Sequence, residues 1–452
     1  MATSRSQVVI VGAGAAGLLA ALRLREAGLD CVLLEARRRG QWGSRYSLEL
    51  DSGSVLNGVL PAPNPEALLH EGRFGADLCS PGRTHRQNVT PLPVFAVRLW
   101  KYQRQLLELV ERVGVEVHFG CEVTNLGVDD RGHTVLSVLQ AGVEVRMVAD
   151  LAVLASGNNH RFDRELYAHF HLRRKILDRE YLAAQHDLWE IDPASVAGNS
   201  PSPPGVVNYV IGNEGPISTL GFWVSPDQRM AGLLAGSLPV DGWRPPAELL
   251  KEARCGAVRF TRRLAGASGH IPVRRPIESL VAPGVALLGN SGCQVYPMTG
   301  CGMGLIGNAA LLLAEASREY CREGRRLEHL WNYNHRYQSD FGARQAASQV
   351  FLEAIRCSPW GSGLVSRLFE LGLSRPEDYL RSLDLGPVAP APLEMMKRLP
   401  GALLLERDKG RYLFAAMGRA AALSQAYRHF YPRRPDGMKV RSFFARTASM
   451  GG

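Results

Sequence analysis

The chain has 452 residues, 46% hydrophobic and 21% charged, a composition that indicates a folded globular protein with a large core. Its net charge of +10 favours an anionic partner or a solvated basic surface, and the absence of a pattern of interleaved cations and aromatic residues argues against nucleic acid. No apolar run reaches the roughly 18 residues of a membrane span. Eight scattered cysteines indicate a reducing cytoplasm and no metal site.

The stretch up to Glu35 predicts a strand, a glycine turn, a helix and a second strand. Gly12, Gly14 and Gly17 have GxGxxG spacing: the first permits a tight turn, the second lets backbone approach a pyrophosphate, and the third lets helix and strand pack closely. Helix-start amides, including those of Ala15 and Ala16, would then bind the phosphates.

Glu35 ends the second predicted strand, with Ala36 beside it, at the distance where a carboxylate accepts both ribose hydroxyls. Because an acid there disfavours a 2′-phosphate, the nucleotide is expected to be FAD or NAD rather than NADP. Arg45 can reach back to the pyrophosphate or be an exposed loop arginine; both interpretations stay open. Residues 46–93 are rich in Gly, Pro and Asn and predict a cap insertion of loops and short helices over the substrate side.

Regular periodicity returns near residue 94 and continues to a buried strand that should rejoin the first sheet. A helix is expected over 99–113, and Val123 of the meander that follows is a further candidate cofactor contact. Gly157 closes the returning strand. The strands expected in this region are 115–119, 121–126, 134–140, 144–149 and 151–155.

A second lobe is expected after residue 183, and the chain then returns to the nucleotide domain. We expect a first part of that domain at 1–183, a sheet at 184–275, a return at 276–325 and helices at 326–452, broken by a Pro-rich linker at 385–392. Within the second lobe the patterns predict strands at 205–211, 219–224 and 232–237 and a helix at 247–264.

A second constellation, from Val285 to Gly304, points to FAD. A strand leads to Gly289 and Asn290, whose side chain could hold a ribityl chain. Close-spaced glycines then let amides approach a planar ring, and the helix that follows points its positive end at the flavin. The candidate contacts in this part are Pro297, Gly300, Gly302, Met303 and Gly304.

With these motifs the chain resembles the FAD-dependent oxidoreductases that include aromatic hydroxylases, squalene epoxidases, ubiquinone-pathway hydroxylases and geranylgeranyl reductases. The resemblance implies an α/β fold: a Rossmann-like, GR2-type FAD-binding domain with an inserted β-sheet substrate domain and a helical C-terminal region. It also implies that Arg98 contacts FAD. The stretch 297–303 is most similar to the squalene epoxidase and geranylgeranyl reductase branch. Residues 221–226 resemble the Trp-x-Phe-Pro strand of geranylgeranyl reductases, with Ser225 in place of the Phe, and this resemblance suggests a large apolar substrate.

Three features limit what the resemblance implies about the reaction. The hydroxylases' Asp-Gly pair is replaced here by Ser156-Gly157, which weakens the case for direct reduction by NAD(P)H. His160 and Arg161 could bind a pyridine nucleotide or an acidic substrate, or simply lie in solvent. Residues 188–193 are not the halogenase motif, so halogenation is not expected.

Cys293 and Cys301 could be redox partners of the flavin or small buried residues.

The sequence leaves three functions open and assigns no catalytic residue. The first is a monooxygenase that hydroxylates or epoxidises an apolar lipid or specialised metabolite. The second is a reductase or dehydrogenase of carbon–carbon double bonds, as in geranylgeranyl reductases, and the third is a redox-neutral flavoprotein cyclase. NAD(P)H or a separate reductase would donate electrons, and the protein would be cytoplasmic, with contact to a membrane surface left open.

Overall fold

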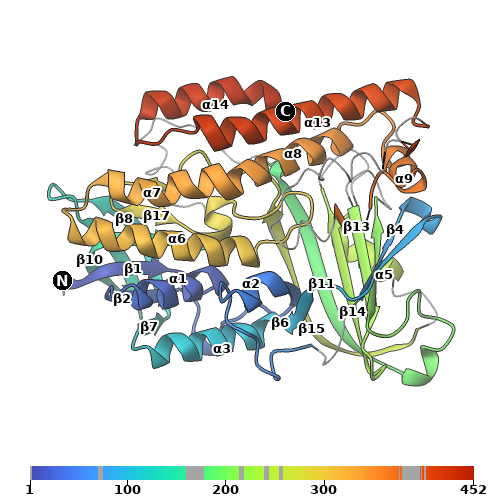
Figure 1. The fold of residues 1–452 in the computed structure, drawn as a ribbon. Helices are drawn as coiled ribbons and strands as arrows, with labels where there is room; N and C mark the ends of the chain where they lie inside the picture. Colours follow the sequence, from blue (N-terminus) through green and yellow to red (C-terminus); the bar gives the residue numbers. More distant parts are fainter. Residues whose placement is uncertain are drawn as a thin grey trace.

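The computed structural model describes residues 3–69, 75–158, 178–212, 218–238, 244–253, 258–375, 377–378, 398, 400–401 and 404–451. Two sheets lie side by side, and helices of the second half of the chain cover one flank of both (Figure 1). The predicted α/β class, with a second sheet and a helical C-terminal region, is confirmed. His160, Arg161 and the linker at 385–392 lie outside the described residues.

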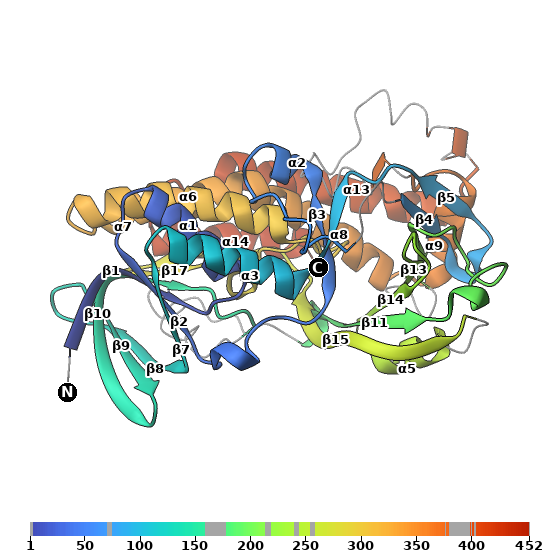
Figure 2. The same ribbon diagram turned by 90° about the horizontal axis from the view of Figure 1, so that it is seen from below.

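The first sheet has the strand order β16-β17-β10-β1-β2-β7. From β17 to β7, each strand is parallel to the next one in this order. Its strands are continuous apolar runs because both faces are covered; Val8, Ile10 and Val153 are fully buried. Helices α1, α3 and α6 lie together on one face, and the β8–β9 hairpin extends from the other side (Figure 2). The elements are β1 (Thr3–Val11), α1 (Ala15–Glu26), β2 (Cys31–Glu35), α3 (Leu99–Arg112), β7 (Glu116–Phe119), β8 (Cys121–Val128), β9 (Thr134–Gln140), β10 (Val143–Leu154), β16 (Val281–Ala282), β17 (Val285–Leu287) and α6 (Met303–Arg322).

β10 is one long strand where the sequence predicted two. Its first half pairs with β9 and with the start of β1, and its second half pairs with β1 and β17. Asp150 lies between the two predicted strands. Its carboxylate is held by Arg325, whose Nη1 is 2.7 Å from Asp150 Oδ1.

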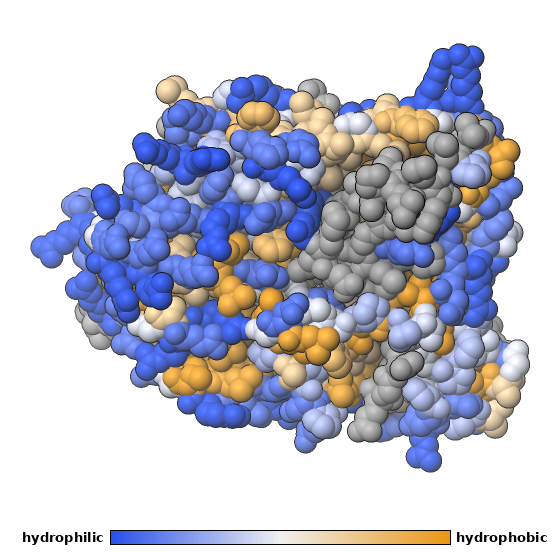
Figure 3. Space-filling model, viewed as in Figure 1, coloured by the Kyte–Doolittle hydropathy of each residue, from blue (hydrophilic) through white to orange (hydrophobic). Residues whose placement is uncertain are grey.

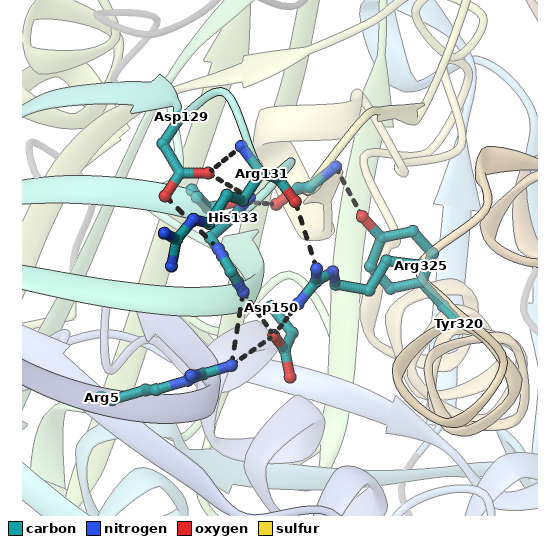
Figure 4. A network of polar contacts seen from close by, with 9 residues as sticks. Arg5, Asp129, Arg131, His133, Asp150, Tyr320 and Arg325 are labelled. Atoms are coloured by element: carbon teal, nitrogen blue, oxygen red, sulfur yellow. Dashed lines mark hydrogen bonds and ion pairs between the residues drawn. The ribbon is translucent and has the colours of Figure 1, made fainter.

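A polar network surrounds Asp150 near the amino-terminal part of the sheet, away from the glycine turn at its carboxyl end (Figure 4). Arg5 and His133 approach the same carboxylate oxygen at 3.7 and 3.9 Å. Arg325 also donates to the Arg131 carbonyl at 3.2 Å, and Asp129 accepts from the amides of the turn after β8. The network joins the end of α6 to β1 and β10 and so fixes how the second half of the nucleotide domain returns to the first.

The second sheet has the order β15-β11-β14-β13-β12-β4-β5. Its strands are β4 (Gly75–Cys79), β5 (Arg86–Val89), β11 (Tyr181–Ile191), β12 (Val206–Ile211), β13 (Ser218–Val224), β14 (Met230–Ser237) and β15 (Phe260–Pro272), and α5 (Pro246–Ala253) lies against β14 and β11. The predicted strands at 205–211, 219–224 and 232–237 are confirmed. The loops and short helices predicted over 46–93 are wrong at β4 and β5, which join this sheet.

The predicted helix at 247–264 is also wrong in its second half, where β15 begins. β15 is a polar, Gly- and Ala-containing edge strand with much of its length exposed, so it lacks the apolar alternation that marks a strand in sequence. It forms because β11 pairs with it from Tyr181 to Ile191. Such pairing is decided by residues about 80 positions away and is invisible to a local pattern.

A small two-stranded sheet lies between the large ones. β3 (Ser47–Asp51) pairs antiparallel with β6 (Val94–Arg98), and α2 (Ser52–Leu56) follows β3. Leu48 and Leu50 of β3 pack into the nucleotide-domain core. The alternate residues of β3 therefore face the second sheet.

The C-terminal helices are α7 (Leu327–Tyr337), α8 (Ala343–Arg356), α9 (Ser362–Glu370), α13 (Arg407–Phe430) and α14 (Gly437–Gly451), with a π-helical turn, η6 (Gln338–Gly342), between α7 and α8. The aromatic stripe on α7 belongs to the core: Trp331, Tyr333 and Tyr337 are fully buried. Among the described residues, no helix is long and apolar enough to cross a membrane.

Candidate functional site

The glycine turn after β1 contains two glycines at which a side chain would clash with the backbone, and one glycine that faces open space. Gly12 has φ +103°, and a Cβ there would lie 2.7 Å from the Ala155 carbonyl oxygen. A Cβ on Gly17 would lie 1.9 Å from the Gly12 carbonyl oxygen. A Cβ on Gly14 would meet nothing within 4 Å, so the space in front of this residue is left open by the protein.

The start of α1 adds hydrogen-bond donors to that open space. Gly14 is the N-cap, no side chain caps the helix, and its first turn has no acidic residue. The first amides, including those of Ala15 and Ala16, thus lack intrahelical acceptors and carry the positive end of the helix dipole. This arrangement fits a phosphate.

Glu35 is held against the glycine turn from the end of β2. Its side chain is buried; Oε2 accepts from the Ala13 amide at 2.9 Å, and Oε1 accepts from the amide and Nε of Arg37 at 3.0 and 2.9 Å. The carboxylate is therefore fixed beside the phosphate-binding turn, as a ribose acceptor must be. Ala36 next to it is exposed, whereas Val123 on β8 is buried.

The second constellation meets the first at Gly289. Its φ is +73°, and a Cβ there would lie 2.8 Å from the Ala16 Cβ. Asn290 follows, half-buried, in the turn η5 (Gly289–Gly292), and Ser291 Oγ donates to the Gly157 carbonyl at 2.9 Å. Three segments far apart in sequence thus converge beside the start of α1.

The start of α6 is a second uncapped helix N-terminus. Gly302 is the N-cap, with no side-chain cap and no acid in the first turn, which includes Met303 and Gly304. Gly300 has φ +69°, and Pro297 before it is buried. A dinucleotide would fit between the two helix starts: Gly14 to Gly17 would hold the pyrophosphate, Glu35 a ribose, Asn290 the ribityl chain, and amides from Gly300 to Gly304 the flavin ring.

Neither of the two predicted arginines makes a side-chain contact with the glycine turn within the described part of the chain. Arg45 is exposed and makes no hydrogen bond or ion pair within the described part of the chain. The Arg98 guanidinium donates to the carbonyls of Leu68 and Leu69, and burial lowers the pKa of Arg98. Arg98 thereby fixes the segment before β4; contact of either arginine with FAD stays a prediction.

The two cysteines of the flavin segment differ in their surroundings. Cys293 is fully buried, and its carbonyl accepts from Gln345 Nε2 at 2.8 Å. Cys301 packs against the second sheet, and burial, reinforced by the nearby carboxylates of Glu49 and Asp51, raises its pKa to about 12. The Cys301 thiol is therefore protonated at neutral pH, which disfavours a nucleophilic role.

The sequence did not point to a pair of polar contacts between β3 and the second sheet. Ser47 Oγ lies 2.9 Å from His186 Nε2, and the Tyr209 hydroxyl donates to Glu49 Oε1 at 2.8 Å. The alternation of Ser47 and Glu49 with two core leucines was a signal of a half-buried strand in this stretch. Their partners could not be found from sequence, since they lie 139 and 160 residues away.

These groups belong to one face of the second sheet. Strand register places Tyr209 opposite Gly221, Trp223 opposite Gly232, and Gly232 opposite Leu188, so all of these side chains point to the same side as His186. A Cβ on Gly232 would lie 2.1 Å from the Trp223 indole nitrogen, so the indole lies flat on this glycine. We call this side the flavin face; the side chains of α5 pack against the opposite one.

The flavin face is mainly apolar and meets the start of α6. Cys301 packs against the same cluster as Leu188 and Trp223. A Cβ on Gly300 would lie 3.6 Å from Ile271 of β15. The Tyr209–Glu49 and Ser47–His186 pairs are therefore isolated polar groups on an otherwise apolar surface, beside the expected position of the flavin ring.

The buried imidazole of His186 predicts a pH-dependent stability. Burial lowers the pKa of His186 from 6.5 to about 4, so the unfolded chain binds more protons than the folded one between those two values. The stabilisation is complete above pH 6.5 and is lost as the pH falls toward 4. From pH 7.5 to 5, this one group should cost about 2 kcal/mol of unfolding free energy.

Denaturant titrations of the wild type and of His186→Gln at both pH values test this expectation. The glutamine keeps a polar partner for Ser47 and does not titrate, so its free energy of unfolding should fall by about 2 kcal/mol less than that of the wild type. Equal losses would show that His186 is not the group responsible.

Known proteins resemble the chain in these regions. The FAD binding domain family model matches residues 5–196. The chain is 24% identical over 370 residues, 76% of this chain and 83% of the relative, to digeranylgeranylglycerophospholipid reductase 1 of Methanococcoides burtonii.

Solved structures share the fold. A geranylgeranyl bacteriochlorophyll reductase-like protein of Thermoplasma acidophilum superposes with a TM-score of 0.69 at 15% identity, covering 88% of this chain and 96% of that one. The flavin-dependent halogenase CmlS superposes with a TM-score of 0.59 at 15% identity, covering 99% and 78%. The solved structures support the fold alone. The match of residues 5–196 to the FAD binding domain family, together with the sequence motifs and the site geometry, supports FAD as the cofactor.

Proposed function

We propose that the chain is a flavin-dependent reductase of carbon–carbon double bonds in a large apolar substrate. The observation that carries the proposal is the flavin face: an apolar wall against the start of α6 that contains a hydrogen-bonded Tyr209–Glu49 pair. An alkene offers no polar group to recognise, so its site needs apolar surface, one hydride source and one proton source.

The wall supplies the first of these needs. Leu188, Val207 and Trp223 are buried, and Ile211 and Cys301 pack against them. Gly221 and Gly232 lie opposite Tyr209 and Trp223, and the two aromatic rings occupy space that side chains at these glycine positions would fill. Such a surface binds an isoprenoid-type chain by burial of apolar area and excludes water from the reacting carbons.

The Tyr209 hydroxyl is the proton source that we assign. Reduced FAD, when bound, would provide the hydride for one carbon of the double bond. Tyr209 delivers its proton to the other carbon, and Glu49, which accepts the Tyr209 hydrogen bond at 2.8 Å, orients the hydroxyl and relays the replacement proton from solvent. The alkene would thereby gain two hydrogen atoms, one as a hydride from the reduced cofactor and one as the proton from Tyr209.

The curated relatives support this choice among the three functions. Besides the Methanococcoides protein, digeranylgeranylglycerophospholipid reductase of Methanoculleus marisnigri is 26% identical over 310 residues, 66% of this chain and 72% of that protein. Both carry the name of a reductase of an unsaturated isoprenoid lipid. A geranylgeranyl-chain lipid is therefore the first substrate to test.

An anaerobic turnover assay distinguishes the functions. The purified holoprotein is reduced chemically, mixed with a geranylgeranyl lipid without oxygen, and the lipid is analysed by mass spectrometry. We expect the gain of two hydrogen atoms per reduced bond. Product that contains an added oxygen atom and forms only in air would establish the monooxygenase instead, and a product of unchanged mass would establish a cyclase. Oxidation of NADH or NADPH in the same assay identifies the electron donor.

A further inference from the structure

The C-terminal helical hairpin carries most of the chain's net charge. We define the basic hairpin as residues 404–451, which comprise α13 and α14; it has ten Lys and Arg and three Asp and Glu, a net +7 of the chain's +10. No Asp or Glu occurs between Lys409 and Pro435 or after Asp436. The positive charge is therefore concentrated on one structural unit.

The hairpin has a buried inner face and an exposed outer face. Ala416, Leu423 and Tyr427 of α13 are buried, and both α13 and α14 pack on α8. The two helices lie side by side along one edge of the molecule (Figure 1). Their outer faces consequently form one continuous surface.

That outer surface combines cations with exposed apolar side chains. Phe414 is 60% exposed, and Phe430 and Met438 are each 72% exposed. Exposed arginines flank them at positions 411, 419 and 428 of α13. Figure 3 shows strongly hydrophilic and apolar residues next to one another along this edge. Exposure of large apolar side chains in water is unfavourable and indicates a partner that covers them.

The outer arginines are not neutralised within the described part of the protein. Glu406 pairs with Lys409, and Asp436 pairs with Lys439. Arg411, Arg419 and Arg428 form no ion pair with a described residue. Their charge is available to an anionic partner.

We propose that the outer face of the basic hairpin binds the surface of an anionic lipid bilayer. Cations at the headgroups with Phe and Met side chains at the acyl boundary are the two components of interfacial binding. A second copy of the hairpin would place a net charge of +7 against another of +7, which is repulsive. A nucleic acid backbone would neutralise the positive charge but would leave the apolar side chains exposed to water. The inference is independent of the reaction that the flavin site performs.

Vesicle co-sedimentation of the full-length holoprotein tests the proposal. Vesicles are made of phosphatidylcholine alone or of phosphatidylcholine with phosphatidylglycerol. We expect binding to the anionic vesicles that weakens with added salt, and little binding to the neutral ones. The variant Arg411→Glu/Arg419→Glu/Arg428→Glu should bind anionic vesicles at least about tenfold more weakly. Phe414→Ser/Phe430→Ser should also weaken binding while leaving the charge unchanged.

The matched control places the same charge change elsewhere on the surface. Arg83, Arg104 and Arg112 are exposed arginines outside the hairpin, and their replacement by glutamate should change vesicle binding by less than about twofold. Flavin content and melting temperature verify that each variant is folded. The proposal is overturned if the wild type fails to bind anionic vesicles, if the control variant loses binding equally, or if the same hairpin arginines bind duplex DNA but not vesicles.

Discussion

The Gly14→Val variant is expected to fold and to contain no FAD. A Cβ at this position meets no protein atom within 4 Å, and the backbone of Gly14 has φ −67° and ψ 178°, which valine adopts without strain. The valine side chain would occupy the space in front of the uncapped start of α1, where the pyrophosphate must approach the backbone. We expect FAD affinity to fall by at least about 100-fold, or roughly 3 kcal/mol.

Gly17→Ala is the informative comparison, because its Cβ would lie 1.9 Å from a backbone oxygen of the same turn. This variant should lose thermal stability even without flavin, whereas Gly14→Val should melt at the temperature of the flavin-free wild type. Visible absorbance after gel filtration measures the flavin-to-protein ratio, and melting curves of the flavin-free proteins measure the fold. One tightly bound FAD per chain in Gly14→Val would refute the assignment of the glycine turn.

The second large effect is expected from Tyr209→Phe, and it rests on the proposed reductase activity. Phenylalanine keeps the ring beside Gly221 and removes only the hydroxyl that donates to Glu49. Loss of a general acid typically costs about 10² to 10⁴ in rate, so kcat should fall at least about 100-fold with little change in KM. Glu49→Gln should lower kcat less, since its amide oxygen can still accept the hydrogen bond.

Tyr412→Phe provides the control: its hydroxyl donates to the Ala354 carbonyl at 2.7 Å, within the helical region. This variant should keep full activity. Flavin content should be normal in all three variants. If the wild type reduces the lipid and Tyr209→Phe retains its rate within about threefold, Tyr209 is not the proton donor although the reductase assignment survives. If the wild type reduces no double bond, the proposed function itself fails.

The nucleotide-binding elements could be predicted from the sequence because each is formed by neighbouring residues. The strand, glycine turn, helix and strand up to Glu35 form one continuous unit, in which each glycine has its own steric requirement. The structure forms β1, α1 and β2 here in the predicted order, and β2 ends at Glu35. The same holds for the start of α6, where Gly302 caps the helix without a side-chain acceptor. The local sequence patterns of the glycine turn and the helix starts were therefore enough to predict an α/β nucleotide-binding fold and its cofactor.

The second lobe was less readable because its strands depend on distant partners. β15 looked partly helical, yet it forms the edge beside β11; β4 and β5 looked like loops, yet β4 pairs in parallel with β12. A strand satisfies its backbone hydrogen bonds through another segment, so its existence is a property of the pair rather than of its own composition.

The sequence by itself determined the fold class and the FAD-binding motifs, because a glycine turn and a helix start are defined by neighbouring residues. Only the tertiary structure decided which side chains meet between the two lobes. It brought Glu49 of β3 to Tyr209 of β12, and Ser47 to His186 of β11. It also turned Arg98 toward the carbonyls of the segment before β4. Side chains meet across lobes according to strand register and packing, and these are fixed only when the whole core assembles.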